Sequence, residues 1–458
     1  MRYQDRLNFS GKKALVVGLG VSGLWTARWL INQGAHVTVS EIRPESDLDR
    51  GLCREVRELG ASLETGGHKQ ETFLDTQTII VSPGVPHDME ILRIAGDRGI
   101  TVTGELELAS RVIETPLIAV TGTNGKTTVT TFLGNMLEKA GLRTFVGGNI
   151  GTPLMAYAAG KRHADYAVVE VSSFQLDTAE TFCPYISMVL NITPDHLDRY
   201  VDYESYVHSK LRIFRNQGPG QYVILNDDDN TLCSVNPGGR VNVLRYGRKR
   251  GPGRSAVIQG KKIRAHIEGA EELCFKLESF SPPGEHNQEN LLGCVLAGLA
   301  MGIEPLVIQE TIDEFKGLPN RLEHVGDLEG VSFYNDSKAT NVDAAVRAVN
   351  SFDRTLVLIA GGRHKGGDYA PLVRAAHGRV KQAVFLGEAR GLLAASFEGT
   401  LPFFEAEDME EAVSVAFSNA ETGDVVLLAP ACSSFDMFKD YVDRGRAFRE
   451  AMEGLYSG

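Results

Sequence analysis

The sequence predicts an α/β protein of three consecutive domains, each built on a mainly parallel sheet. Short apolar strands followed by a polar or glycine-rich loop and an amphipathic helix recur along the chain, a pattern typical of parallel sheets covered by helices. A length of 458 residues allows two to four domains, and no short-period repeat is present. We therefore expect domains at residues 1–113, 114–317 and 318–458.

The expected strands divide among these three segments. They are Ala14–Gly18, Ala35–Ser40, Thr78–Val81 and Gly99–Thr103, then Leu117–Val120, Tyr166–Val171 and Ile186–Leu190, then Val331–Tyr334, Thr355–Ala360, Gln382–Leu386 and Asp424–Ala429. The stretch Pro237–Phe280 is rich in Gly, Arg and Lys with short alternating segments, which predicts a small β insertion.

Composition excludes several classes of protein. The net charge of −12 argues against sequence-independent binding to nucleic acid, which needs a basic face. The sequence shows neither a signal peptide nor a run of about 18 apolar residues, so we expect a cytoplasmic protein without a membrane span. Its six cysteines lack CxxC spacing and are expected to be buried free thiols. We expect a monomer.

The first glycine loop, Gly18-Leu19-Gly20-Val21-Ser22-Gly23, lies between a strand and a helix. With Glu41 after the next strand, it fits the fingerprint of a Rossmann-like dinucleotide site and by itself would suggest an NAD-dependent dehydrogenase. The fingerprint physically specifies a diphosphate at a helix N-terminus, so another diphosphate ligand, such as UDP, fits equally well.

The second glycine loop has the features of a phosphate-binding loop. It follows the strand Leu117–Val120 and precedes a helix at Thr127–Ala140, with apolar residues at helical spacing. Its residues are Thr121, Gly122, Thr123, Asn124, Gly125, Lys126, Thr127 and Thr128. Backbone N–H groups and the Lys126 cation would face the phosphates, and Thr127 could reach Mg²⁺. The spacing departs from the strict pattern, so a glycine turn with a chance lysine is the alternative.

Ionisable residues follow the next strands. Glu170 ends one strand, and Asp195, His196 and Asp198 follow another, where parallel strands bring ligands to one sheet edge. Carboxylate oxygens suit Mg²⁺, although Glu170 could instead form a structural ion pair and His196 could simply be packed. Lys210 lies on the apolar face of a helix at Tyr203–Phe214, where a lysine either extends to solvent or has a function.

These motifs together resemble the Mur ligase family over essentially the whole chain. TGTNGKTT, VEVSSFQL, NITPDHLDR and HSKLRIF look like the central ATP-binding domain of that family. The resemblance implies catalytic roles for Lys126, Glu170, His196, Lys210 and Lys338. It also implies that Thr127, Glu170, His196 and a carbamylated Lys210 hold Mg²⁺, with two ions expected.

Later motifs extend the resemblance to substrates. PGEHNQEN implies ATP contacts from Asn287 and Asn290, LPNRLE implies one from Arg321, and NDSKATN implies one from Asp336. NDSKATN and PACSSFD look like the D-glutamate-adding members, which implies D-glutamate contacts from Thr340, Lys365, Ser434, Phe435 and Tyr441. The implied residues for the UDP-linked substrate are Gly20, Val21, Ser22, Ser40, Ser82, Pro83, Gly84 and Asn149. Arg363 and His364 depart from the family, because relatives often have an acidic residue before this lysine.

The resemblance implies an ATP-dependent ligase that joins D-glutamate to UDP-N-acetylmuramoyl-L-alanine through an acyl phosphate. The third domain would be Rossmann-like and would bind ATP and D-glutamate. A sister ligase that adds another amino acid, a folate polyglutamylating enzyme, a dehydrogenase and a non-catalytic nucleotide-binding module remain alternatives.

Overall fold

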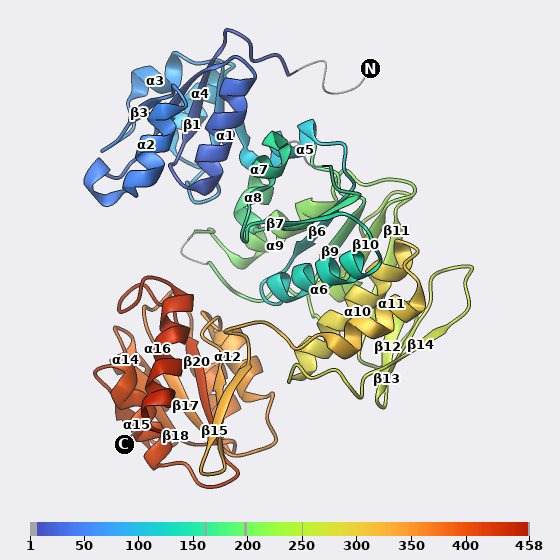
Figure 1. Ribbon diagram of the computed structural model, residues 1–458, viewed down its shortest axis with the longest axis vertical. Helices are drawn as coiled ribbons and strands as arrows, with labels where there is room; N and C mark the ends of the chain where they lie inside the picture. Colours follow the sequence, from blue (N-terminus) through green and yellow to red (C-terminus); the bar gives the residue numbers. More distant parts are fainter. Residues whose placement is uncertain (1–6, 161–162, 197–198, 250, 457–458) are drawn as a thin grey trace.

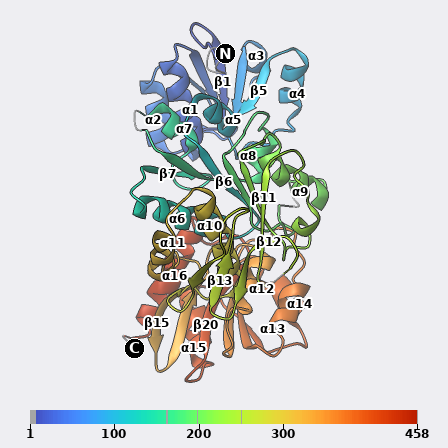
Figure 2. The ribbon, with the colours of Figure 1, turned by 90° about the vertical axis from the view of Figure 1, so that its right-hand side faces the viewer.

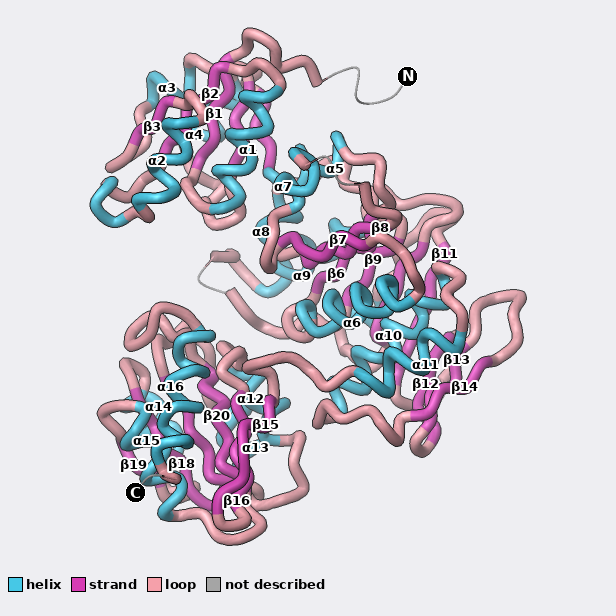
Figure 3. The backbone as a smooth tube through the Cα atoms, in the orientation of Figure 1, coloured by secondary structure: helices cyan, strands magenta, loops and turns pink. Residues whose placement is uncertain are grey.

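The computed structural model describes residues 7–160, 163–196, 199–249 and 251–456, which form three α/β domains stacked along the long axis (Figures 1 and 2). Each domain contains one sheet with helices on both faces (Figure 3). The expected fold class is therefore confirmed. Within the described part of the chain, no helix is both long and apolar enough to span a membrane.

The first domain has a five-stranded parallel sheet with strand order β3-β2-β1-β4-β5. Its strands are β1 (Lys13–Val17), β2 (His36–Ser40), β3 (Ser62–Glu64), β4 (Thr78–Val81) and β5 (Thr101–Gly104), and its helices are α1 (Val21–Asn32), α2 (Arg50–Glu58), α3 (Gln70–Leu74) and α4 (Glu90–Asp97), with a 3₁₀ turn at Glu45–Asp47. The first glycine loop connects β1 directly to α1. A Cβ atom at Gly23 would overlap the Gly18 carbonyl oxygen, so the tight turn requires glycine there.

The central domain has a nine-stranded sheet with order β14-β13-β12-β11-β10-β9-β6-β8-β7. Its strands are β6 (Leu117–Thr121), β7 (Thr144–Gly148), β8 (Tyr166–Glu170), β9 (Ile186–Val189), β10 (Tyr222–Asn226), β11 (Asn242–Gly247), β12 (Arg254–Gln259), β13 (Lys262–Ala265) and β14 (Leu273–Lys276). Its helices are α5 (Glu105–Val112), α6 (Lys126–Lys139), α7 (Leu154–Ala159), α8 (Ser173–Asp177), α9 (Tyr203–Leu211), α10 (Glu285–Ala300) and α11 (Pro305–Glu314), with 3₁₀ turns at Arg212–Phe214 and Leu232–Ser234.

Strand β6 is buried along its whole length, which explains its uninterrupted apolar sequence. The predicted apolar stripe of α6 is buried against the sheet. The β insertion expected at 237–280 does form strands, but they extend the central sheet instead of making a separate unit. Strands β10, β11 and β12 run parallel, and β12, β13 and β14 continue as antiparallel neighbours.

The third domain has a six-stranded sheet with order β15-β16-β20-β17-β18-β19, parallel except for β15. Its strands are β15 (Glu323–Leu328), β16 (Val331–Asn335), β17 (Leu356–Gly361), β18 (Val380–Leu386), β19 (Phe403–Glu405) and β20 (Val425–Ala431). Its helices are α12 (Val342–Val349), α13 (Ala370–Ala376), α14 (Arg390–Phe397), α15 (Met409–Ser418) and α16 (Tyr441–Gly454). Separate apolar clusters fill the two faces of the sheet.

All six cysteines are free, but the expectation that they are all buried is wrong. Cys53, Cys294 and Cys432 are buried, whereas Cys183, Cys233 and Cys274 are exposed. Cys183 lies in the loop before β9, Cys233 in the 3₁₀ turn Leu232–Ser234, and Cys274 on the edge strand β14.

Helix α5 links the first two domains, although it precedes the boundary predicted between residues 113 and 114. It packs against α7, and the two lie side by side (Figures 1 and 2). The buried Glu107 carboxylate accepts hydrogen bonds from the backbone N–H groups of Glu180, Thr181 and Phe182 and from Arg111. Both domain boundaries remain predictions, but these contacts attach α5 to the central domain.

Replacing Glu107 with alanine is expected to lower the free energy of unfolding by about 3 kcal/mol, because it leaves three backbone donors and Arg111 without their anion. Urea denaturation followed by circular dichroism measures this loss. The control is Glu58→Ala, which removes an exposed partner of Arg54 and should cost less than about 1 kcal/mol. Equal losses in the two variants would contradict the anchoring role of Glu107.

Candidate functional site

A cavity of about 270 Å³ lies between the central and third domains. The phosphate loop and the ends of the central strands contribute Thr123, Asn124, Gly125, Lys126, Thr127, Asn149, Glu170, Asp195 and His196, and the third domain contributes Arg321, Lys338, Thr340, Asn341, Lys365, Ser433, Ser434, Phe435 and Tyr441. The structure thus brings together residues predicted to bind phosphate, metal and D-glutamate. We call this space the central cavity.

The phosphate loop is held open by hydrogen bonds to a neighbouring strand end. Asn191 accepts the Asn124 N–H through its side chain at 2.8 Å and the Thr123 N–H through its backbone carbonyl at 2.9 Å. Gly125 precedes α6 with φ +88°, a left-handed conformation that favours glycine. The loop therefore directs the start of α6 toward the cavity, as anion binding at a helix N-terminus requires.

Two lysines, the partly buried Lys126 and the fully buried Lys210, converge on one carbonyl oxygen of this loop. Lys126 Nζ donates to Gly122 O at 2.8 Å, and Lys210 Nζ donates to the same oxygen at 2.9 Å. Burial lowers the pKa of Lys126. Burial, followed by the repulsion from Lys126, holds the pKa of Lys210 well below its usual range. Of the two alternatives for a lysine on an apolar helix face, Lys210 does not extend to solvent. It is buried behind the phosphate loop.

Hard oxygen ligands for a divalent cation gather around Glu170. The Thr127 hydroxyl donates to Glu170 Oε2 at 2.7 Å, and Asn149 Nδ2 donates to Oε1 at 3.0 Å. Within the described residues, no three His, Cys, Asp or Glu side chains converge as a ready-made metal site. This arrangement fits Mg²⁺, because that ion commonly takes one or two carboxylates and completes its shell with water and substrate phosphates.

His196 lies in the turn after β9 with a positive φ of 56°. Asp195 Oδ1 accepts the His196 N–H at 2.9 Å, and the His196 ring packs edge-on against Phe174. Burial lowers the pKa of His196, and Lys365 lowers it further against the opposing effect of Asp195. The imidazole is therefore held in its neutral, ligand-competent form. Leu197 and Asp198 of the same motif lie outside the described residues.

A smaller pocket of about 60 Å³ adjoins the phosphate loop. It is lined by predicted ATP residues of two domains together with others, namely Asn124, Gly125, Thr128, His286, Asn287, Asn290, Arg321, Leu322, Asp336, Lys338, Ala339, Ala344 and Arg347. Burial raises the pKa of Asp336 to about 7 and lowers the pKa of Lys338 to about 8. Both changes reduce the charge in this pocket when no ligand is bound.

The first domain forms a larger cavity of about 600 Å³ with the central domain, which we call the first cavity. Of the residues predicted for the UDP-linked substrate, Gly20, Val21, Ser22, Ser82, Pro83, Gly84 and Asn149 line it. Ser40 does not; it is buried behind the wall, where its hydroxyl lies 2.8 Å from His68 Nδ1. Asn149 lines both the first and the central cavity, so it marks where they approach one another.

The third-domain loops at the central cavity are held by the fully buried Arg444. Its guanidinium donates to the carbonyl oxygens of Ser337, Gly361, Cys432 and Ser433, and to the Ser337 hydroxyl. An antiparallel bridge between Arg363 and Ser433 joins two of these loops. These contacts therefore hold the loops that carry Thr340, Lys365 and Ser434.

Sequence reasoning missed several residues that shape these sites. Arg43 and His68 line the first cavity, His286 and Arg347 line the smaller pocket, and Asn191, Arg444 and Asn341 hold loops in place. Polar side chains paired across domains leave no periodic signal. The sequence offered one indication of such a residue, namely a polar residue within a motif that resembles the family, such as Asn341 in NDSKATN.

Comparison with known proteins identifies the family. Residues 12–104 match the Mur ligase MurD-like N-terminal domain, residues 120–298 the Mur ligase middle domain, and residues 320–432 the Mur ligase glutamate ligase domain. The chain is 44% identical to a UDP-N-acetylmuramoylalanine–D-glutamate ligase of Desulfosudis oleivorans, over 98% of this chain and 97% of that protein. The chain belongs to the Mur ligase family. A protein of the same name from Pelotomaculum thermopropionicum is 43% identical, over 98% of this chain and 99% of its own length.

Solved structures of Mur ligases share the three-domain fold. A pseudomurein peptide ligase type C from Methanothermus fervidus has a TM-score of 0.60 at 20% identity. The alignment covers 97% of this chain and 100% of that one. A MurF ligase of Thermotoga maritima in complex with ADP has a TM-score of 0.60 at 16% identity, covering 97% of this chain and 96% of its own. At these identities the likeness concerns the fold alone.

Replacing Gly125 with alanine is expected to weaken ADP binding at least about tenfold, because the new Cβ would lie 2.7 Å from Asn290 Oδ1 in a left-handed conformation. Isothermal titration calorimetry with ADP measures the change. The control is Gly141→Ala, which has a similar φ of +80° but no atom within 4 Å of the new Cβ. It should cost about 1 kcal/mol of stability and leave ADP affinity unchanged; unaltered affinity in the Gly125 variant would refute the prediction.

Proposed function

We propose that this Mur ligase joins D-glutamate to UDP-N-acetylmuramoyl-L-alanine at the expense of ATP. The observation that carries the proposal is the central cavity, where the phosphate loop faces Lys365, Ser434 and Thr340 of the third domain. The names of the relatives aligned over nearly the whole chain support D-glutamate as the amino acid. A sister ligase that adds another amino acid is the remaining alternative, and a dehydrogenase would leave the second and third domains without a role.

The arrangement of cavities supports a path for the UDP-linked substrate. In the proposal, its diphosphate binds at the start of α1 and its muramoyl-alanine end passes Asn149 into the central cavity. The L-alanine carboxylate then lies beside the phosphate loop. ATP occupies the smaller pocket with its γ-phosphate toward Lys126, between the central and third domains.

In the first step, a carboxylate oxygen of L-alanine attacks the γ-phosphorus of ATP. The bond to the β–γ bridging oxygen breaks, ADP leaves and an acyl phosphate forms. Lys126 and the N–H groups at the start of α6 hold the phosphoryl oxygens in line and offset their charge. Mg²⁺, when bound, supplies further charge neutralisation at these oxygens.

Two magnesium ions would be held by Thr127, Glu170, His196 and a carbamylated Lys210, and would offset the charge of the phosphoryl oxygens. The low pKa of Lys210 supports the modification, because a neutral amine can add to CO₂. A nitrogen–carbon bond forms, one proton is released, and the lysine becomes a carbamate with two oxygen ligands. Of the two lysines that share Gly122 O, Lys126 then remains as the cation.

In the second step, the D-glutamate amine attacks the acyl carbon. The amide bond forms, the carbon–oxygen bond to phosphate breaks, and the amine loses a proton as phosphate leaves. Lys365 is placed to pair with a carboxylate of D-glutamate, and Ser434 and Thr340 offer hydroxyl groups. Because Lys365 and Ser434 come from the third domain, its docking against the phosphate loop assembles the complete site.

Phosphate release with ATP, Mg²⁺ and UDP-N-acetylmuramoyl-L-alanine tests the proposal directly. We expect release that depends on D-glutamate, compared with L-glutamate, L-lysine and meso-diaminopimelate. Lys126→Ala should lower kcat by about 100-fold or more, since it removes a cation at the transferring phosphoryl group. Lys139→Ala, at the far end of the same helix, is the control and should retain activity. Release driven by another amino acid would assign the chain to a sister ligase.

The pH profile provides a second measurement. With the pKa of Lys338 lowered to about 8, its cation is present below this pH and lost above it, so kcat/KM for ATP should fall as pH rises through about 8. Lys338→Arg keeps the charge at all accessible pH values and should remove this fall, even if its overall rate is lower. Persistence of the same fall in the arginine variant would show that another group causes it.

A further inference from the structure

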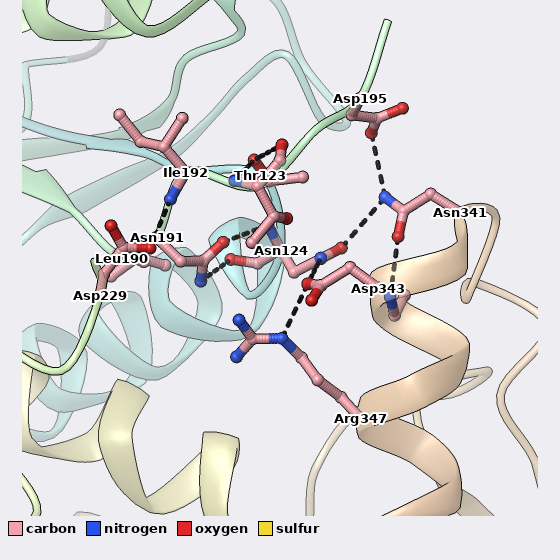
Figure 4. Close-up of polar contacts among 12 residues, drawn as sticks. Thr123, Asn124, Leu190, Asn191, Ile192, Asp195, Asp229, Asn341, Asp343 and Arg347 are labelled. Carbon is pink, nitrogen blue, oxygen red and sulfur yellow. Dashed lines mark hydrogen bonds and ion pairs between the residues drawn. The ribbon is translucent and has the colours of Figure 1, made fainter. Parts of the chain in front are cut away.

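Asn341 joins the third domain to two segments of the central domain. It is the N-cap of α12, and its Oδ1 accepts the Ala344 N–H at 2.8 Å. Its side-chain Nδ2 donates across the domain interface to Asp195 Oδ2 at 3.0 Å, and lies 3.5 Å from Asn124 Oδ1 of the phosphate loop (Figure 4). One amide group thus begins a helix in one domain and contacts two loops in another.

The contact with Asp195 bears on the neighbouring His196. Asp195 is largely buried, and its other oxygen, Oδ1, accepts the His196 N–H at 2.9 Å. A hydrogen bond from Asn341 fixes the rotation of this carboxylate about its Cβ–Cγ bond. The carboxylate also accepts from the backbone of His196, whose φ is positive, so hydrogen bonds connect Asn341 to the His196 turn through Asp195.

A second connection holds the phosphate loop from the same helix. Asn124 Nδ2 donates to Asp343 Oδ2 at 2.8 Å, and Arg347 Nε donates to the same oxygen at 2.8 Å (Figure 4). Asn124 is also held within the central domain, since its backbone exchanges two hydrogen bonds with the Asn191 side chain. The first turn of α12 therefore contacts both loops that flank the central cavity.

We propose that Asn341 is a positioning residue that couples docking of the third domain to the geometry of the phosphate loop and the His196 turn. The inference rests on the proposed function. An N-cap alone does not require this residue, because Asn, Asp and Ser cap helices about equally well. The interface does require it. Serine lacks the amide donor that reaches Asp195, and aspartate would place a second carboxylate against the first.

Three variants distinguish the role of Asn341 as the N-cap of α12 from its role in coupling the third domain to the central domain. Asn341→Ser and Asn341→Asp both retain a cap oxygen, and Asp408→Ser makes a comparable change at the N-cap of α15, away from the interface. We expect kcat for phosphate release to fall about tenfold in Asn341→Ser and about 100-fold in Asn341→Asp, with KM for the UDP-linked substrate and the melting temperature little changed. Asp408→Ser should keep the wild-type kcat.

A double-mutant cycle that combines Asn341→Ser with Asp195→Asn tests whether Asn341 acts through Asp195. If Asn341 acts through Asp195, the combined loss in kcat is smaller than the product of the two single losses. A combined loss equal to that product, or a wild-type kcat in Asn341→Ser, overturns the inference. Wild-type protein without D-glutamate-dependent release overturns the proposed function instead, so the two failures are distinguishable.

Hydrogen–deuterium exchange of the ligand-free protein gives a readout independent of activity. In Asn341→Ser we expect faster exchange in central-domain peptides covering residues 121–126 and 191–196, across the interface from the substitution. Faster exchange confined to α12 would show that Asn341 serves the helix alone and would overturn the inference.

Discussion

The Gly122 carbonyl oxygen accepts hydrogen bonds from the side-chain nitrogens of Lys126 and Lys210, and the phosphate loop is arranged around this shared acceptor. Burial lowers the pKa of both lysines, and the nearby carboxylates of Asp195 and Glu170 act in the opposite direction on each of them. The loop must also turn sharply enough to present that carbonyl inward while its N–H groups face outward. The glycines of the loop, the amide of Asn191 and the strand-end carboxylates serve this single requirement.

The third domain supplies the side chains that face the phosphate loop across the central cavity. The central domain supplies the phosphate loop and the carboxylates, but the cations and hydroxyls opposite them come from Lys338, Lys365 and Ser434. Burial lowers the pKa of Lys338 and raises that of Asp336, so the walls carry less charge before ligands arrive. An incoming polyphosphate would favour the charged form of Lys338 and the neutral form of Asp336, and both effects reduce repulsion of the ligand.

Much of the fold and of the phosphate-binding region could be predicted from the sequence, because residues close together in the chain determine them. The strand–loop–helix unit around Lys126 follows from a buried strand, a glycine turn and an amphipathic helix, and Glu170 follows from the end of a buried strand. Strands β3 and β19 have three residues each, too few for periodicity to appear, and β15 has no fully buried residue to mark an inner face. That β11–β14 extend the central sheet depends on edge pairing, which no local pattern encodes. Arg444 is one of several polar residues in the sequence of α16, and its partners become evident only in the folded loops.

The buried guanidinium of Arg444 has a wider consequence. All its hydrogen-bond acceptors belong to the third domain, so the loops that carry Lys365 and Ser434 keep their shape without help from the rest of the chain. A scaffold that is self-supporting in this way can be recombined. A third domain exchanged for that of a relative would keep these loop shapes, but it would also have to supply the contacts that Asn341 and Asp343 make with the central domain.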